Sequence, residues 1–200
     1  TPVDPGAAVD FGDMQGLLRF GHGHLEACAF LLLRIRDAAA AARWLGQASF
    51  TSASALDEPP ETALQVAFSG QGLLAMGLDR EIVDEFSEEF NTGMSGNSNR
   101  SRRLGDVGAN DPTHWHWGGA GDDGIHLLLM CYAAEGQLDE HLAFTGEEDF
   151  GQAFERLQTL ESRYAAPEEP FGFADGISQP KVDWSQTVST DPHDRAVYGN

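Results

Sequence analysis

The sequence has few basic residues and no long hydrophobic run. Its 12 lysines and arginines stand against 32 aspartates and glutamates, which gives a formal net charge of −20. Such a charge repels a phosphate backbone and argues against nucleic acid as a partner. No window approaches the ~18 consecutive apolar residues that a membrane span requires, so we expect no membrane segment. A soluble protein is expected, either cytoplasmic or secreted after removal of a leader, because the chain opens at Thr1 without a signal-like apolar core.

Cysteine is also scarce. Cys28 and Cys131 are the only two, and each lies inside an apolar, strand-like run. Two cysteines this far apart do not make a disulfide framework. We therefore expect free thiols, reduced and shielded on central strands of a sheet.

The hydrophobic pattern predicts strands alternating with helices in one generous domain of 200 residues. Apolar runs predict strands at 26–36, 48–54, 63–69 and 125–134. A first helix is predicted from the N-cap Asp37 to Gly46, and a short one at 70–78. A third is predicted at 79–90, with Ile82, Val83, Phe86 and Phe90 on one face. The last is predicted to begin at the capping box of Thr145 and Glu148 and to carry the apolar stripe Phe150, Phe154, Leu157 and Leu160.

This order reads as strand–helix–strand–strand–helix–strand, with an insertion before the last strand. It predicts an α+β, ferredoxin-like (split βαβ) domain whose antiparallel sheet carries helices on one face. We expect this domain to span residues 1–165. A long inserted loop rich in Gly, Asn, Ser, Arg and Trp is expected at about 91–124, and residues 166–200 are expected to be loop-like.

Two histidine pairs have the spacing of a shared metal site. His114 and His116 in "THWHWGG" would point to one side of an extended chain, and His22 and His24 in "GHGH" repeat that geometry. No third ligand stands at a useful spacing. A surface loop with aromatic anchors is the favoured interpretation of "THWHWGG".

A basic cluster stands out in this acidic chain. Arg100, Arg102 and Arg103 lie together in "NRSRRLGD". They could bind a carboxylate or a propionate group. Pairing with the chain's own surplus of acids is the favoured alternative.

The stretch "PFGFADGISQP", residues 170–180, places Asp175 between Phe171, Phe173 and Ile177. Enclosure by apolar residues would raise the pKa of this carboxyl group and suit it to proton transfer. The other interpretation is an Asp-Gly turn whose side chain caps local amides. On residue types alone, the turn is favoured.

Four segments together resemble the dye-decolorizing peroxidases, a family of heme enzymes. "FGDMQGLLRFGHGH" is similar to the family's opening, "RRLGDVGANDPTHWHWGG" to its Arg-Leu-Gly-Asp segment, and "IHLLLMCYAA" to a core strand. "FGFADGISQP" matches the specific Gly-x-x-Asp-Gly motif and its Ile-Ser-Gln-Pro continuation. The resemblance runs over nearly the whole chain.

The resemblance implies that Asp175 stands over the distal face of heme b. There it would move a proton between the oxygens of hydrogen peroxide so that the O–O bond breaks. The motif residues expected at the heme are Phe173, Ala174, Asp175, Gly176, Ile177, Ser178 and Gln179. The axial histidine of the iron and a distal arginine are expected from a part not in this chain. His193 lies too near the motif to match the axial ligand.

The resemblance thus implies a peroxidase that reduces hydrogen peroxide and oxidises bulky aromatic or dye-like substrates. Family members are longer, so this chain would be the first of two ferredoxin-like domains, and residues 166–200 would carry the distal heme loop. A second domain or chain is then the expected partner. A remnant or binding module of the same fold without heme is the alternative. A third, a chlorite-dismutase-like small-ligand protein, is disfavoured by the Gly-x-x-Asp-Gly match.

Overall fold

The computed structural model describes residues 9–54, 59–119, 124–163 and 171–173. Its helices and strands are, in chain order, η1 (Phe11–Asp13), α1 (Leu17–Phe20), β1 (Ala27–Ile35), α2 (Ala38–Gln47), β2 (Thr62–Phe68), α3 (Gly70–Ala75), α4 (Arg80–Val83), α5 (Glu88–Thr92), α6 (Ser98–Leu104), η2 (Gly108–Asn110), η3 (Pro112–His114), β3 (Leu127–Ala133), α7 (Leu138–His141), η4 (Ala143–Gly146), α8 (Glu148–Ala153) and β4 (Phe154–Arg163).

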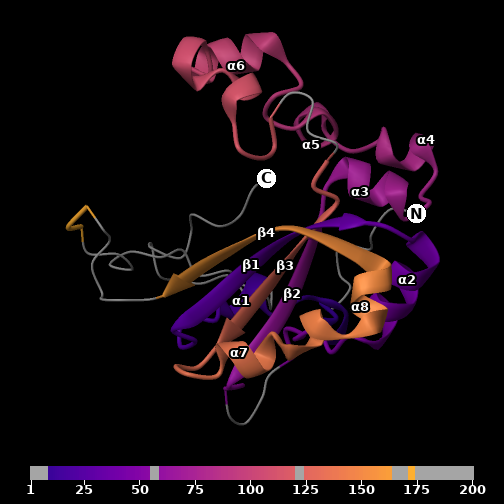
Figure 1. Ribbon diagram of the computed structural model, residues 1–200, viewed down its shortest axis with the longest axis vertical. Coiled ribbons are helices and arrows are strands. Elements are labelled where there is room, and N and C mark those ends of the chain that lie inside the picture. The colour runs from indigo at the N-terminus through magenta and orange to yellow at the C-terminus, as the bar shows by residue number, and fades with distance from the viewer. Residues whose placement is uncertain (1–8, 55–58, 120–123, 164–170, 174–200) are drawn as a thin grey trace, which may run out of the picture.

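The four strands form one antiparallel sheet in the order β2-β3-β1-β4 (Figure 1). The connection from β1 to β2 carries α2, and that from β3 to β4 carries α7 and α8. Two strand–helix–strand units are therefore interleaved in one sheet, which is the ferredoxin-like arrangement. The predicted fold class is confirmed.

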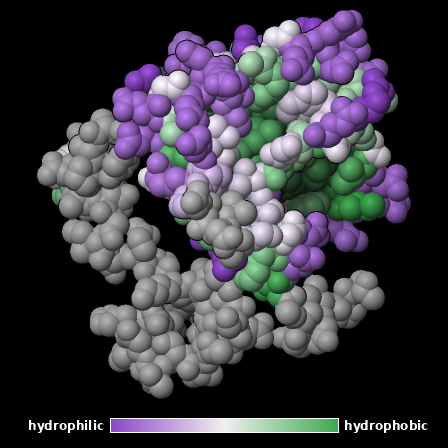
Figure 2. Space-filling model, turned by 90° about the horizontal axis from the view of Figure 1, so that it is seen from below, coloured by the Kyte–Doolittle hydropathy of each residue, from purple (hydrophilic) through white to green (hydrophobic). Residues whose placement is uncertain are grey.

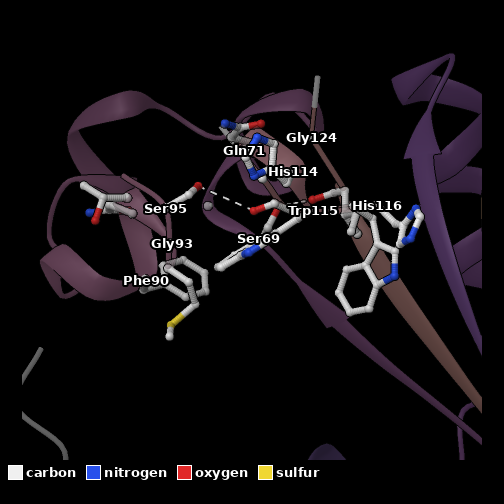
Figure 3. A pocket seen from close by; sticks show the side chains of 17 residues that line it. Ser69, Gln71, Phe90, Gly93, Ser95, His114, Trp115, His116 and Gly124 are labelled. Atoms are coloured by element: carbon white, nitrogen blue, oxygen red, sulfur yellow. Dashed lines mark hydrogen bonds between the residues drawn. The ribbon is translucent and has the colours of Figure 1, made fainter. Parts of the chain in front are cut away.

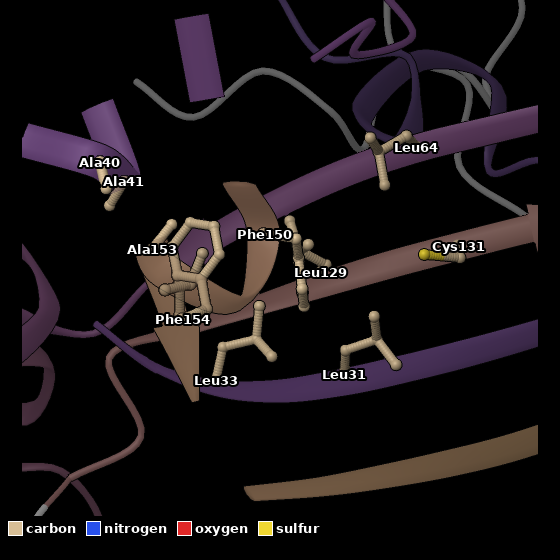
Figure 4. Close-up of a cluster of buried hydrophobic side chains, with 11 residues drawn as sticks. Leu31, Leu33, Ala40, Ala41, Leu64, Leu129, Cys131, Phe150, Ala153 and Phe154 are labelled. Atoms are coloured by element: carbon tan, nitrogen blue, oxygen red, sulfur yellow. The ribbon is translucent and has the colours of Figure 1, made fainter. Parts of the chain in front are cut away.

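One face of the sheet packs against α2 and α8 and forms the core (Figure 4). Leu31 of β1 pairs with Leu129 of β3, and both side chains are fully buried on this face. Alternate residues of a strand point to the same face, so Leu33 and Leu127 are buried there as well. Trp44 of α2 closes this core, with ring centroids 5.3 to 5.5 Å from those of Phe144, Phe150 and Phe154. This core fixes the sheet on which the rest of the molecule is built.

Several predicted elements are found at or close to their expected places. β1 and β3 lie within the predicted segments, β2 is shifted by one residue toward the N-terminus, and α3 begins at the predicted residue. Asp37 caps α2 as expected, its carboxylate accepting a hydrogen bond of 2.7 Å from the Ala40 amide. The helix ends at Gln47, so Gly46 lies inside it and does not close it.

The strand predicted at 48–54 was wrong. This segment forms one isolated bridge, between Ser52 and Gln15, and its other hydrogen bonds to Leu64 and Gln65 of β2 and to residues 14–19 are scattered. It runs beside the outer edge of β2 without forming a ladder. The alternation of its side chains was therefore misread as a strand.

The helix predicted from Thr145 to Leu160 was wrong over most of its length. α8 starts after Glu147, which makes no side-chain cap, and it ends at Ala153. From Phe154 onward the chain is β4, paired along the outer edge of β1. The backbone groups of that edge need partners, and a long ladder with them outweighs a helical stripe of apolar residues.

The helix predicted over 79–90 is split into α4 and α5. Ser87 interrupts it by capping α5, where its hydroxyl accepts from the Phe90 amide at 3.3 Å. Val83 is buried, but Ile82 and Phe86 are about half exposed, so the expected single apolar face does not form. The segment predicted as a loop contains α6, η2 and η3 within its described residues 91–119, and with α3 to α5 these helices build a helical lobe beyond the end of the sheet (Figure 1).

The surface seen from below is largely hydrophilic, with hydrophobic residues gathered in a hollow (Figure 2). Within the described ranges, no helix is long and apolar enough to cross a membrane.

Candidate functional site

Most of the predicted heme contacts fall outside the described residues. Ala174, Asp175, Gly176, Ile177, Ser178 and Gln179 lie there, as does His193. Phe173 is described and is 71% exposed, and Phe171 is 86% exposed. Gly172 between them has φ +82°, which favours glycine. The two rings therefore lie exposed at the described end of the motif.

A cavity with a volume of about 690 Å³ lies in the helical lobe (Figure 3). Its lining comes from residues 69–71, 90–95, 114–119 and 124–125. The histidine and tryptophan residues of "THWHWGG" line it together with Phe90 and Met94. Figure 3 shows Phe90 and Ser95 on one side of this cavity and His116 on the other.

One wall is fixed by a close contact between α3 and the start of β3. A Cβ on Gly72 would come within 1.8 Å of the His126 carbonyl oxygen, so only glycine fits there. The Ser69 hydroxyl caps α3 and donates to the Ile125 carbonyl at 2.6 Å. Gln71 lies beside Gly124 in the lining of the cavity.

A second wall, 90–95, is held by Arg100 of α6. Its guanidinium donates to the Gly93 carbonyl and, at 3.1 Å, to the Thr92 hydroxyl. It also lies 3.9 Å from the Glu88 carboxylate and 3.7 Å from that of Glu89. Arg100 thus pairs with the chain's own acids, the favoured interpretation of the basic cluster.

The third wall is a loop that is folded on itself. Asp111 accepts hydrogen bonds from the hydroxyl and the amide of Thr113, at 2.6 and 2.9 Å, and these bonds lower the pKa of this carboxyl group. The Trp115 indole donates to the Asn110 carbonyl at 2.9 Å. Gly119 lies so close to Pro112 that a Cβ would meet its carbonyl oxygen at 2.1 Å. The aromatic anchor expected in this loop is present, and it fixes the Trp115 ring before any ligand arrives.

The chemistry of this cavity suits binding. His114 and His116 are exposed, and the described ranges contain no group of three or more His, Cys, Asp or Glu residues placed to hold a metal ion. The aromatic, thioether and glycine lining suits a flat apolar ligand. The loop pattern of "THWHWGG" identified Trp115 and Trp117 as candidate site residues. Sequence reasoning missed Phe90, which it placed on the apolar face of a helix, and Met94.

The other histidine pair contributes to a smaller cavity, of about 280 Å³, beside residues 51–52 and 59–60. His22 is buried at φ +53°, and its Nε2 lies 3.3 Å from the Gln65 amide nitrogen. Burial lowers the pKa of His22, and the charge of His24 adds to the effect. His24 lies 6.4 Å away between ring centroids, and its Nε2 is 3.0 Å from the Pro60 carbonyl. Burial therefore disfavours the charged form of His22, whose contact with Gln65 ties it to the sheet.

Both cysteines are free, as predicted. Cys131 is fully buried in the core, where it pairs with Ala29 of β1. Cys28 is the residue before Ala29, so its side chain points to the opposite face of the sheet, where it is half-buried. Both lie on central strands, β3 and β1. The shielding expected for both is therefore complete only for Cys131.

Comparisons with known proteins point in one direction, although no family model matches. A dye-decolorizing peroxidase of Exidia glandulosa is 27% identical over 187 residues, covering 88% of this chain and 35% of that protein. A solved peroxidase of this type from Auricularia auricula-judae is 26% identical and has a TM-score of 0.67, covering 90% of this chain and 40% of that one.

The chain resembles the dye-decolorizing peroxidases. A third match, a solved dye-decolorizing peroxidase in complex with 2,6-dimethoxyphenol, has a TM-score of 0.67 and covers 90% of this chain and 41% of that one. At 23% identity it shows the shared fold. The chain spans about a third of the length of its curated dye-decolorizing relatives.

Proposed function

We propose that this chain is part of a heme peroxidase of the dye-decolorizing type and supplies the acid on the distal side of the heme. The observation that carries the proposal is the similarity to dye-decolorizing peroxidases over about 90% of the chain. The Gly172-x-x-Asp175-Gly176 motif supports it, because its match is specific. The family resemblance, and not a bound group, is what implies heme b.

The described end of the motif fits a contact with a flat macrocycle. Phe171 and Phe173 are exposed large hydrophobic residues next to a glycine with positive φ, and such residues mark a surface that another apolar group covers. Phe173 and the six motif residues after it would hold the heme at this surface. When bound, heme supplies the iron at which hydrogen peroxide reacts. The axial histidine is assigned to no residue of this chain.

Asp175 would transfer the proton between the two peroxide oxygens. Its carboxylate would accept the proton of the peroxide oxygen nearer the iron and deliver it to the farther oxygen, which leaves as water. A group that first accepts and then donates a proton needs a pKa near the working pH. Enclosure of Asp175 by Phe171, Phe173 and a further surface would raise the pKa of its carboxyl group toward that range.

The expected partners follow from the same proposal. Hydrogen peroxide would be the oxidant, and an aromatic molecule the reductant, as the names of the relatives indicate. The exposed phenylalanines and the length of the relatives support a second domain or chain that completes the heme pocket.

The test is the replacement Asp175→Asn in the heme-loaded protein that carries this chain. We expect the reaction with hydrogen peroxide, followed by stopped-flow absorbance, to slow by roughly 10²- to 10⁴-fold, the usual contribution of a positioned acid–base group. Asp139→Asn, at an exposed residue of α7, is the matched control and should react like the wild type. An unchanged rate in the Asp175→Asn variant would remove Asp175 from the mechanism.

A further inference from the structure

We propose that the cavity in the helical lobe binds a planar aromatic cation. The cavity holds about 690 Å³, within the range of roughly 300 to 1,000 Å³ typical of small-molecule sites. Binding of such a ligand in this cavity would need no heme. The proposal therefore stands apart from the peroxidase function, and the two are tested separately.

Aromatic faces are presented by two of its walls. Phe90 follows Glu89 on α5, and Trp115 and Trp117 come from the loop opposite. Trp115 is held by its indole bond to Asn110, so its ring is oriented in advance. A flat ring that enters between such faces gains stacking energy at a small entropic cost.

Apolar side chains remain accessible at this cavity. Trp117 is 47% exposed and Met94 is 54% exposed, although both are large and hydrophobic. Several such residues gathered around one cavity mark a ligand or partner site. Met94 adds an adaptable thioether, which makes favourable contacts with aromatic edges.

The charge around the cavity selects the sign of the ligand. Residues 79–92, which include α5, carry six carboxylates and one basic residue, Arg80. The following helix α6 adds Arg100, Arg102 and Arg103, so residues 79–104 keep a small excess of acid within a chain of net charge −20. Arg100 offsets part of this charge through its long contacts with Glu88 and Glu89. A cation is therefore attracted to this wall and an anion is repelled.

The ring faces are not used by the chain's own cations. In the described ranges, the arginine–ring contacts are those of Arg19 with Phe11 and Phe20, far from this cavity in the sequence. Phe90 already packs against Phe86, with ring centroids 4.8 Å apart, so the faces of Trp115 and Trp117 are the ones that a ligand cation would cover. A planar aromatic cation combines stacking, cation–π attraction and charge complementarity in one molecule.

The test compares two planar tricyclic dyes of opposite charge by equilibrium dialysis against the purified chain at neutral pH. Methylene blue is the cation and resorufin is the anion. We expect methylene blue to saturate one site per chain, and resorufin to bind at least roughly tenfold more weakly. Trp117→Ala should weaken methylene blue binding by roughly tenfold, because stacking and buried area are lost together.

Leu104→Ala is the matched control. Leu104 lies on α6, is 54% exposed and is not among the residues that line the cavity. Its replacement by alanine leaves the net charge unchanged. We expect this variant to bind methylene blue like the wild type, and thermal unfolding to show that both variants are folded. Three results would each overturn the proposal: no saturable site, equal affinity for the two dyes, or equal weakening by Trp117→Ala and Leu104→Ala.

Discussion

At the scale of single residues, the two thiols differ although their strands are neighbours. Burial in the core raises the pKa of Cys131 to about 12, with a further contribution from the nearby Cys28. Burial also raises the pKa of Cys28, and hydrogen bonds from Ser162 oppose the shift. Because the thiolate is the reactive form, both thiols should react slowly, and Cys131 the more slowly of the two.

We predict that thiol labelling of the native protein modifies Cys28 partially and leaves Cys131 untouched. Complete labelling of both should require denaturant. Mass spectrometry of the labelled peptides after a time course with an alkylating reagent distinguishes the two sites. Rapid native labelling of Cys131 would show that β3 is not the buried strand described here.

His22 makes the stability of the fold depend on pH. Burial lowers its pKa in the folded state below the ordinary value of 6.5, so the unfolded chain binds the proton more readily. The stabilisation is present above about pH 6.5 and is lost as the pH falls below it. Burial and Arg34 lower the pKa of His126 as well, so it contributes in the same direction.

We predict that His22→Asn flattens the decrease in the free energy of unfolding between pH 7.5 and pH 5. Asparagine tolerates the positive φ of this position, and the slope against pH, measured by urea unfolding, is the readout. The contribution of His126 remains in the variant. Equal slopes in the two proteins would exclude His22 as a source of the pH dependence.

At the scale of elements, Gln15 protects the outer edge of the sheet. Its side-chain amide accepts a hydrogen bond of 2.7 Å from the Val66 amide and donates one of 2.8 Å to the Val66 carbonyl. Gly16 beside it has its backbone so close to Ser52 that a Cβ would meet the Ser52 carbonyl oxygen at 2.8 Å. The "QG" of the opening segment is therefore explained by the structure of the β2 edge.

We predict that Gln15→Leu lowers the free energy of unfolding by about 1 to 3 kcal/mol, because it leaves two backbone groups of Val66 without their partner. Gln47→Leu, at an exposed residue of α2, is the control and should change stability by less than about 0.5 kcal/mol. Chemical denaturation of both variants measures the difference. A loss at Gln47 as large as that at Gln15 would contradict the proposed role of the edge contact.

The elements also show how far sequence patterns reach. β1 and β3 were predictable because they are buried on the helix-covered face and carry continuous apolar runs. β4 was missed because Phe154, Leu157 and Leu160 fit a helical period, while its pairing with β1 comes from distant residues. The predicted fold class was right although one strand was wrongly placed at 48–54 and β4 was missed. The two errors left the predicted number of strands the same as the number in the sheet.

At the scale of the whole molecule, the two sites were predictable to different degrees. Asp175 was identified by a short motif whose meaning comes from resemblance, and its geometry stays a prediction. The cavity in the helical lobe unites four segments, and only the "THWHWGG" loop carried a visible pattern. Contacts such as Arg100 with Gly93 and Gly72 with His126 bring the other walls together, and these depend on the finished fold.

The proposal for the whole molecule is that this chain forms one side of a heme pocket that a further domain completes. The measurement that tests this most directly is a hemin titration followed by absorbance. It compares the 200 residues alone with the same residues joined by a polypeptide that corresponds to the remainder of the relatives.

Alone, the chain should bind hemin weakly and lack the Soret band of a histidine-ligated ferric heme, because its axial ligand is expected elsewhere. With the completing polypeptide, we expect stoichiometric binding, a histidine-type spectrum and turnover of hydrogen peroxide, because the apolar ring becomes enclosed. A stoichiometric, histidine-type spectrum from the chain alone would contradict the account, as would a completed complex that binds heme and shows no turnover.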